Sequence, residues 1–251
     1  ALKAAPARQI TIILSDVVGS PPAVIASGPT VPDPTTYHDA LNILERYSGK
    51  VCFPPEIRDI LQQGASGCLP ETAKANHSAF ARSSIFLAAE NRTAALSAAN
   101  CAKGLGYSAE AVSENYTGEA SECGRKIASY CSRLNKNQVL VFGGETTVHL
   151  TGTGHGGRNL EMALSAVRTM AEHPGCILVT LATDGEDGPT DAAGAIVDSE
   201  TLRKALSLGL DPDHYLRNND SWHFFESVGG LIKTGPTGTN VNDLTFLIRC
   251  E

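Results

Sequence analysis

Short apolar runs alternate with amphipathic segments along most of the 251-residue chain. The apolar runs have the length and the β-branched content of buried strands, and they predict strands at residues 10–14, 84–88, 107–112, 139–142, 147–150, 177–182, 231–232 and 244–248. Apolar residues spaced three and four apart predict helices at residues 37–47, 56–63, 93–103, 118–134, 160–173, 198–208 and 220–226. This alternation predicts an α/β protein with mostly parallel sheets.

A polar, small-residue stretch at residues 64–79 interrupts this pattern. It favours two domains, residues 1–80 and residues 81–251. The chain opens with ALKAAPARQITIILSD, which lacks an initiating Met and a signal-peptide pattern and passes almost at once into a predicted strand. We therefore expect the natural start of the protein to lie upstream.

Composition and charge narrow the classes of partner. The chain is 42% hydrophobic and 19% charged, with a net charge of −7. An acidic chain without a basic block argues against nucleic acid and against anionic membranes as partners. No apolar run is long enough to span a membrane. The seven cysteines are irregularly spaced and form no CxxC pair, which predicts reduced thiols in an intracellular protein.

The segment GTGHGGRN, residues 152–159, precedes a predicted helix. Glycines allow the backbone to approach an anion, and a helix N-terminus supplies free N–H groups. Gly156, Gly157, Arg158 and Asn159 are therefore candidate phosphate-binding residues, and the Arg158 guanidinium also suits a carboxylate. The alternatives are a solvated glycine-rich loop, or a dinucleotide site of the GxGxxG type.

The segment GGETT, residues 143–147, follows a predicted strand. Two glycines at a strand end, followed by an acid and hydroxyls, predict a second anion-contacting turn that includes Gly143, Gly144, Glu145 and Thr146. The alternative is a tight turn into the next strand.

The segment ATDGEDGPTDAAGA, residues 182–195, places several carboxylates on a glycine-rich loop. Crowded carboxylates repel one another unless a cation or proton intervenes. Asp184, Asp187 and Asp191 could hold Mg²⁺ or accept the proton of an attacking hydroxyl, whereas Glu186 is expected to be a solvated turn residue. Beside two anion-seeking loops, this loop predicts phosphoryl transfer.

The segment TGPTGTNVND, residues 234–243, offers hydroxyls, amides and a carboxylate on a preformed turn. Thr237 and Asn240 are candidate contacts to a polar ligand. The alternative for Asn240 is that its side chain caps neighbouring backbone groups.

Together, SDVVGSPPAVIASGPTVPD, FGGETTVHLTGTGHGGRNLEMAL and the acidic and TGPTGTNVND segments closely resemble the class II glycerate 2-kinases, whose carboxyl-terminal unit is the MOFRL domain. The resemblance implies phosphorylation of D-glycerate at its 2-hydroxyl with ATP and Mg²⁺. It also implies two Rossmann-like α/β domains with the active site in the cleft between them. It fits a homodimer and a cytoplasmic location, with a mitochondrial location as an alternative.

Carried over by position, Arg158 matches the family's active-site arginine, which would bind the glycerate carboxylate or the transferring phosphoryl group. Asp184 and Asp191 match the acidic loop, one as base for the 2-hydroxyl and the other at the metal, with Asp187 as a further metal ligand. Other residues fall in motifs expected to face the substrate: Ser15, Asp16, Ser27, Thr30 and Asn91.

This chain departs from the family pattern in four respects. Ser20 and His155 replace residues common in the family, and Trp222 is unusual at its position. The family's amino-terminal half, with a lysine near the ATP phosphates, has no counterpart here. The resemblance therefore implies an incomplete first domain and weak or no activity for this chain alone. Two other hypotheses stay open: a non-catalytic nucleotide- or phosphate-binding module, and a nicotinamide-dependent dehydrogenase of small hydroxy acids.

Overall fold

The computed structural model describes residues 1–250 and divides the chain into two compact units. The first contains residues 1–13 and 19–88, and the second contains residues 14–18 and continues from residue 89. The division therefore falls at the last residue of strand β2 (Ser83–Ala89), whereas the sequence predicted a boundary before this strand. Each unit is described by itself.

The first unit carries a two-stranded sheet of β1 (Gln9–Leu14) and β2, together with α1 (Tyr37–Tyr47) and α2 (Pro55–Ala65). Two 3₁₀ turns, Ile25–Ser27 and Ser78–Phe80, complete it. A capping box explains where α1 begins, since the side chains of Thr36 and Asp39 each bind the other's backbone N–H. The predicted helices and strands of this part are confirmed.

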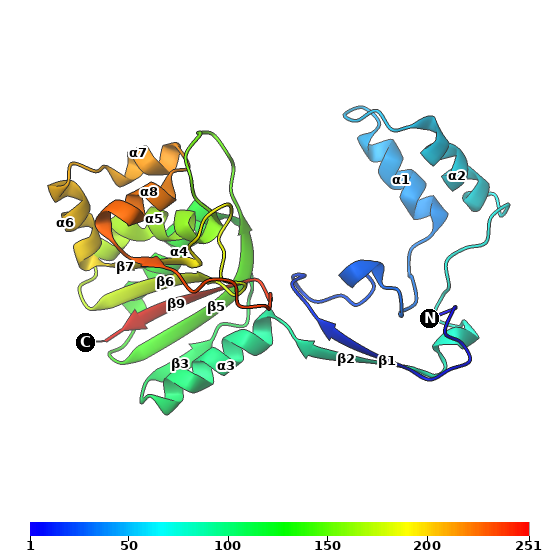
Figure 1. The fold of residues 1–251 in the computed structure, drawn as a ribbon, viewed down its shortest axis with the longest axis horizontal. Helices are drawn as coiled ribbons and strands as arrows, with labels where there is room; N and C mark the ends of the chain where they lie inside the picture. Colours follow the sequence, from blue (N-terminus) through cyan, green and yellow to red (C-terminus); the bar gives the residue numbers. More distant parts are fainter. Residues whose placement is uncertain (251) are drawn as a thin grey trace. The chain divides into compact units, whose positions relative to one another are not determined.

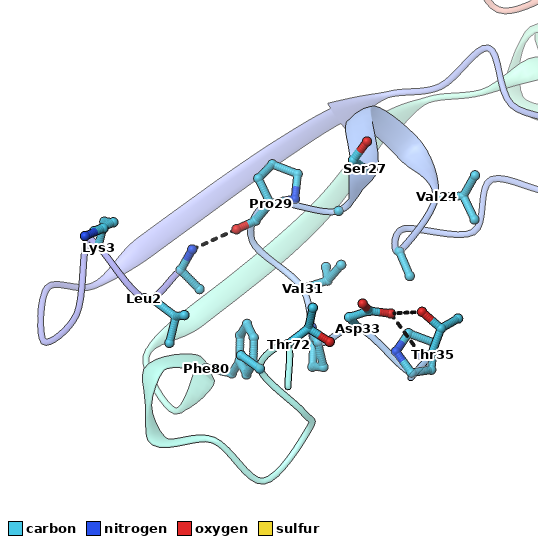
Figure 2. A pocket seen from close by; sticks show the side chains of 16 residues that line it. Leu2, Lys3, Val24, Ser27, Pro29, Val31, Asp33, Thr35, Thr72 and Phe80 are labelled. Atoms are coloured by element: carbon cyan, nitrogen blue, oxygen red, sulfur yellow. Dashed lines mark hydrogen bonds between the residues drawn. The ribbon is translucent and has the colours of Figure 1, made fainter. Parts of the chain in front are cut away.

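A cavity of about 590 Å³ lies within the first unit (Figure 2). Its wall includes apolar side chains such as Leu2, Val31 and Phe80, with Asp33 at one side. Asp33 accepts hydrogen bonds from the backbone N–H and the hydroxyl of Thr35, at 2.9 and 2.7 Å. The Asp33 carboxylate is thus oriented by two neutral donors, and Lys3 also lines the cavity.

The second unit is built on a seven-stranded sheet with the order β3-β5-β9-β6-β7-β8, and β4 also pairs with β5 (Figure 1). The strands are β3 (Ser108–Ala111), β4 (Tyr116–Glu119), β5 (Gln138–Thr147), β6 (Cys176–Ala182), β7 (Gly194–Asp198), β8 (Leu231–Ile232) and β9 (Asp243–Arg249).

Strand direction confirms the α/β class and corrects the expected pairing. β3, β4, β5, β6 and β8 run in one direction, and β7 and β9 run in the other. Because β9 lies between β5 and β6, and β7 lies between β6 and β8, only the β3–β5 and β4–β5 pairs of this sheet are parallel. The sheet is therefore mixed, although most of its strands share one direction.

Helices cover both faces of this sheet (Figure 1). On one face, α3 (Asn91–Gly104) packs against Val139 and Val141 of β5. On the other face, Phe142 belongs to the larger core, which is built around α5. The helices of that side are α4 (Ala120–Ser129), α5 (Arg158–Ala171), α6 (Ser199–Ser207), α7 (Pro212–Arg217) and α8 (Ser221–Val228). Neighbouring side chains of β5 enter different cores because successive side chains of a strand point to opposite faces of the sheet.

Three local predictions are wrong. The expected turn at residues 143–147 continues β5, so the strand predicted at 147–150 is instead loop. The helix predicted at 118–134 is shorter, since β4 precedes α4 and a 3₁₀ turn (Tyr130–Arg133) follows it. β7 and α7 were not predicted.

Two further sequence expectations concern the whole chain. None of the helices in residues 1–250 has the length and hydrophobicity needed to span a bilayer. All seven cysteines are present as free thiols.

A close approach between α4 and α5 gives a stability prediction. A Cβ added at Gly124 would lie 2.1 Å from the Met162 carbonyl oxygen and 2.2 Å from Ser165 Oγ. We expect Gly124→Ala to lower the free energy of unfolding by about 1–3 kcal/mol, because the two helices must separate. Urea denaturation would measure this change.

The matched control is Gly104→Ala in α3, where an added Cβ has no atom within 4 Å. This control should leave stability unchanged or raise it by up to about 1 kcal/mol, since alanine lowers the entropy of the unfolded chain. Equal effects of the two substitutions would contradict the packing argument.

Candidate active site

The N-terminus of α5 is capped from inside the protein by Asp187. One carboxylate oxygen accepts the backbone N–H of Asn159 at 3.0 Å and its side-chain amide at 3.2 Å, and the other accepts the Leu160 N–H at 2.8 Å. Asp187 is only 1% exposed, and this burial raises its pKa to about 6. A Cβ at Gly157 would lie 2.4 Å from the Asp187 carboxyl carbon, so glycine is required there. Asp187 therefore holds the helix start, and both of its oxygens are occupied.

The residues just before α5 keep two free donors. Within residues 1–250, the backbone N–H groups of Gly156 and Gly157 have no hydrogen-bond partner. Both glycines line a cavity of about 520 Å³ together with Arg158. Other residues on its wall are Thr146, Thr147, Glu161, Gly188, Pro189 and Asn219. The structure thus brings the glycine-rich loop, the end of β5 and the acidic loop around one cavity.

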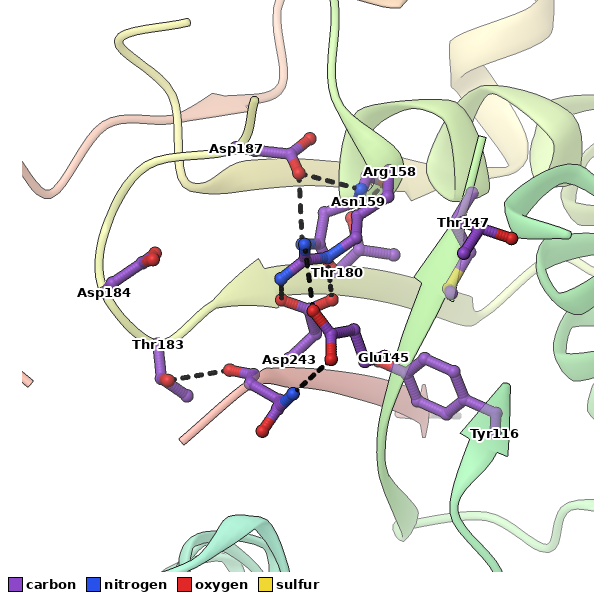
Figure 3. Close-up of polar contacts among 12 residues, drawn as sticks. Tyr116, Glu145, Thr147, Arg158, Asn159, Thr180, Thr183, Asp184, Asp187 and Asp243 are labelled. Carbon is purple, nitrogen blue, oxygen red and sulfur yellow. Dashed lines mark hydrogen bonds and ion pairs between the residues drawn. The ribbon is translucent and has the colours of Figure 1, made fainter. Parts of the chain in front are cut away.

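Arg158 lies between two carboxylates (Figure 3). Its Nε and Nη2 donate to the two oxygens of Asp243 at 2.6 and 3.1 Å, and its Nη1 lies 3.3 Å from Glu145. Burial alone would lower the pKa of Arg158, but the hydrogen bonds and charge of Asp243, followed by Glu145, outweigh burial and raise it. The guanidinium is always charged and is held in one orientation, with Nη1 on its more exposed side.

Two asparagines hold the partners of Arg158 in place. Asn242 donates to the second oxygen of Glu145 at 2.7 Å. Asn91, at the start of α3, donates to the carbonyl oxygens of Val241 and Asp243 at 2.8 and 2.9 Å. Asn91 was expected on the substrate side. Here it is buried and fixes the strand end that carries Asp243.

The glycines of GGETT serve strand packing. A Cβ at Gly143 would lie 1.9 Å from Asn91 Oδ1, and one at Gly144 would lie 2.1 Å from the Tyr116 carbonyl oxygen. Both glycines are buried within β5, so neither offers a free turn to an anion. Glu145 reaches Arg158, and Thr146 is 3% exposed with a hydroxyl that has no partner within residues 1–250.

Asp184 and Asp191 differ sharply within the acidic loop. Asp191 binds Lys233 at 2.7 Å and accepts from the Trp222 indole N–H at 2.9 Å. The hydrogen bond from Lys233, and then the one from Trp222, lower the pKa of Asp191. Asp184 is half-buried and forms no ion pair within residues 1–250, and its carboxylate accepts only the Glu186 N–H, at 3.2 Å. Asp184 is therefore the less constrained carboxylate of the loop.

The TGPTGTNVND residues stabilise the loops beside Asp184. Thr237 donates its hydroxyl to the Thr183 carbonyl at 2.7 Å and its N–H to the Asp184 carbonyl at 2.9 Å. Asn240 accepts the Asn242 N–H at 2.9 Å, which is the capping alternative. These bonds connect the strand carrying Asp243 to the acidic loop.

The remaining predicted residues form no hydrogen bond or ion pair with Arg158 within residues 1–250 and are described within their own units. Ser15 is buried and closes a local turn by accepting the Val17 N–H at 3.2 Å, while Asp16 is exposed. Ser27 and Thr30 belong to the first unit, where Ser27 lines the cavity of Figure 2. The structure of the second unit does not bring Ser27 or Thr30 to its cavity.

Sequence reasoning missed Asp243 and Asn219 as individual site residues. The sequence does contain a signal for Asp243. This residue directly precedes the apolar run LTFLI, so it could be expected at the start of a buried strand, which is β9. Asn219 lies outside every glycine-rich motif, in the connection between α7 and α8. No local pattern indicates its contacts with the glycine-rich loop.

Two predicted ligands can be tested against this geometry. A dinucleotide site needs parallel neighbouring strands on both sides of the glycine-loop helix, but β9 separates β5 from β6 and is antiparallel to both. The dehydrogenase hypothesis is therefore wrong. For a metal, no group of three or more His, Cys, Asp or Glu side chains suited to an ion occurs within residues 1–250. The chain's residues do not fit a self-contained metal site.

Comparisons with known proteins agree with these observations. A sequence model of the MOFRL family matches residues 138–243, and a domain of unknown function, DUF4147, matches residues 1–62. A glycerate kinase of Macaca fascicularis is 33% identical, over 96% of this chain and 72% of its own length. This chain belongs to the glycerate kinase family. The match places Arg158 and the acidic loop inside the MOFRL region, as the sequence motifs implied.

Two further comparisons involve Thermotoga maritima. A D-glycerate 2-kinase is 44% identical over 95% of this chain and 56% of its own length. The crystal structure of a glycerate kinase matches with a TM-score of 0.85 and 42% identity, over 98% of this chain and 58% of that one. The α/β fold of this family member is thereby confirmed. The chain spans just over half the length of this curated relative and of the matched crystal-structure chain.

Proposed function

We propose that this chain is the carboxyl-terminal part of a kinase that transfers a phosphoryl group from ATP to the 2-hydroxyl of D-glycerate, giving 2-phospho-D-glycerate. The observation that carries the proposal is the cavity at the start of α5, where Arg158 meets the unpartnered N–H groups of Gly156 and Gly157. Preorganised donors of this kind stabilise the negative charge of a transferring phosphoryl group. The similarity to a D-glycerate 2-kinase and a glycerate kinase supports glycerate as its acceptor.

Each donor has a defined part in this proposal. The Gly156 and Gly157 N–H groups bind oxygens of the phosphoryl group, at the positive end of α5. Arg158 Nη1 exchanges its 3.3 Å contact with Glu145 for a substrate oxygen, while the Asp243 pair keeps the guanidinium oriented. Asp243 thus acts as a positioning residue.

Asp184 is the base that we assign to the 2-hydroxyl. Its carboxylate has no ion pair within the described chain, whereas that of Asp191 is bound by Lys233 and Trp222. A carboxylate whose pKa is lowered by such partners is a weaker proton acceptor. We assign Asp191 the role of holding Lys233 and Trp222 beside the loop.

Mg²⁺ was expected at Asp184 and Asp187. Asp187 does not suit this role, because its oxygens bind α5 and lie out of contact with solvent. Mg²⁺ in kinases is held largely by substrate phosphates, with only one or two carboxylates from the protein. We derive no step through the ion.

A location inside the cell, in the cytoplasm or in mitochondria, and a homodimeric state remain parts of the proposal. The free thiols support the intracellular location, because disulfides form mainly in oxidising compartments.

The test is an enolase-coupled assay of the complete natural protein that contains these residues, with D-glycerate, ATP and Mg²⁺. We expect formation of 2-phosphoglycerate, and a loss of at least 100-fold in turnover for Asp184→Asn, whose size and fold contacts are nearly unchanged. Glu186→Gln, on the same loop and exposed, is the matched control and should retain turnover.

The outcomes separate the proposal from its alternative. ATP binding by calorimetry without any product in the wild-type protein would favour the non-catalytic nucleotide-binding module. Full turnover in Asp184→Asn would remove Asp184 as the base. Neither result would alter membership of the family.

A further inference from the structure

The side chain of Asn219 binds the backbone of residues 149–152, where the glycine-rich loop begins. Its Oδ1 accepts the backbone N–H groups of Thr151 and Gly152 at 2.8 and 2.9 Å. Its Nδ2 donates to the His149 carbonyl at 3.3 Å and to the Glu161 carboxylate at 3.0 Å. Asn219 is 7% exposed, so water cannot readily replace these bonds. Through them, the loop is joined to the first turns of α5.

The neighbours of Asn219 continue this pattern. The Thr153 N–H donates to the Asn218 side chain at 3.2 Å, and the Gly154 N–H donates to the Asn218 carbonyl at 2.8 Å. The His155 N–H donates to Asp220 at 2.9 Å. Every backbone N–H from residue 151 to residue 155 is therefore occupied by the connection between α7 and α8.

The close contact also explains the glycines of this loop. A Cβ at Gly152 would lie 2.3 Å from the Asn218 carbonyl oxygen, and one at Gly154 would lie 2.3 Å from the Asp220 Cβ. Asn219 itself has a φ of 52°, a left-handed conformation that asparagine tolerates better than most residues. The glycines of the loop thus make room for residues 218–220, and the asparagine at position 219 suits the backbone conformation found there.

We infer that Asn219 is a positioning residue that shapes the glycine-rich loop before ligand binds, so that the N–H groups of Gly156 and Gly157 are the ones left for an anion. The identity of this anion rests on the proposed function, in which it is a phosphoryl group of ATP. Preorganisation of the loop removes an ordering cost that binding would otherwise carry.

The test compares amide hydrogen exchange in the wild-type chain and in Asn219→Gly, residue by residue. Glycine accepts the left-handed φ without strain but removes every side-chain hydrogen bond of Asn219. We expect exchange at Thr151 and Gly152 to rise at least tenfold, more than elsewhere in the second unit, whose melting temperature should fall because buried hydrogen bonds are lost. The affinity for ATP, measured by calorimetry, should fall at least tenfold.

Asn137→Gly is the matched control, because Asn137 is exposed, has a φ of 55° and has no side-chain hydrogen bond within residues 1–250. It should change neither the exchange at residues 151–152 nor the affinity for ATP. Unchanged exchange at both amides in Asn219→Gly would overturn the inference. Faster exchange in this variant, with no binding of ATP to the complete natural protein, would support the positioning role and count against the proposed function.

Discussion

Replacing Arg158 with alanine is expected to lower the free energy of unfolding by about 3 kcal/mol and to abolish anion binding at the cavity. The stability effect arises because Asp243, whose side chain is 1% exposed, would lose both hydrogen bonds of its ion pair. Breaking a buried pair from one side typically costs about 3–5 kcal/mol. We take the lower end because the Arg158 side chain is 31% exposed and water screens part of the interaction.

Urea denaturation at neutral pH measures the stability effect, and calorimetry with ATP measures the binding effect. The double substitution Arg158→Met with Asp243→Asn removes both charges of the pair. It should recover most of the lost stability, because no buried charge is left uncompensated, but it should not recover binding. A single Arg158→Ala variant of wild-type stability would show that the pair with Asp243 does not form.

This design matters because an inactive Arg158→Ala variant alone would not identify a catalytic group. Arg158 connects α5 to β9 through Asp243 and approaches β5 through Glu145. The same side chain therefore holds the sheet end together and presents Nη1 to the cavity. The double substitution separates these two roles.

The sequence predicted the regular elements well wherever burial alone decides the pattern. β6 and β9 were recognised because each is a largely apolar run, and α1 because its apolar positions share a face. The direction of β9 was not recognisable, since an antiparallel strand in the middle of a sheet has the same apolar residues as a parallel one. Strand order and direction depend on connections far apart in the chain.

The glycines of GGETT show a second limit of sequence reasoning. Paired glycines usually indicate turns, but Gly143 and Gly144 lie within β5 because Asn91 and β4 approach its backbone closely. Those neighbours are far away in sequence. The sequence shows that these two positions are glycines, but it does not show that close neighbours in the fold require them.

The acidic loop shows the same limit for chemistry. Asp184, Asp187 and Asp191 are identical side chains within eight residues, and all were predicted to contact metal or substrate. Tertiary packing makes Asp187 a buried helix cap and Asp191 the exposed partner of Lys233. Of these three aspartates, only Asp184 neither caps a helix nor pairs with a lysine within residues 1–250.

The carboxyl group of Asp187 is expected to titrate near pH 6 in the folded protein, where an unperturbed aspartate titrates near 3.8. Burial is the main cause, and the N–H groups of Leu160 and then Asn159 oppose it only in part. The difference between the two pKa values corresponds to about 3 kcal/mol. Carbon-13 NMR of the carboxyl group would measure the midpoint directly.

The effect on stability follows from the direction of this shift. Because the folded state binds the proton more tightly than the unfolded state, the contribution of Asp187 is fully present below about pH 4 and is lost as the pH rises through about 6. Asp187→Asn cannot ionise and so does not lose stability in this way. The destabilisation caused by Asp187→Asn should therefore shrink by about 3 kcal/mol between pH 4 and pH 7.5, as measured by urea denaturation.

Asp191→Asn is the control on the same loop. The pKa of Asp191 is lowered by Lys233, so its ion pair is formed throughout the range in which Asp187 titrates. The effect of Asp191→Asn should stay constant between pH 5 and pH 7.5. A constant effect of Asp187→Asn across that range, or a carboxyl midpoint below pH 4, would contradict the argument.

A phosphate group bound at the start of α5 should also change the pKa of Asp187. The Gly156 and Gly157 N–H groups and the carboxylate of Asp187 lie at the same helix start, so an anion on those amides would repel the charged form of Asp187. Saturating ATP should therefore move the midpoint of Asp187 above 6. An unchanged midpoint in the presence of bound ATP would place the nucleotide away from the start of α5.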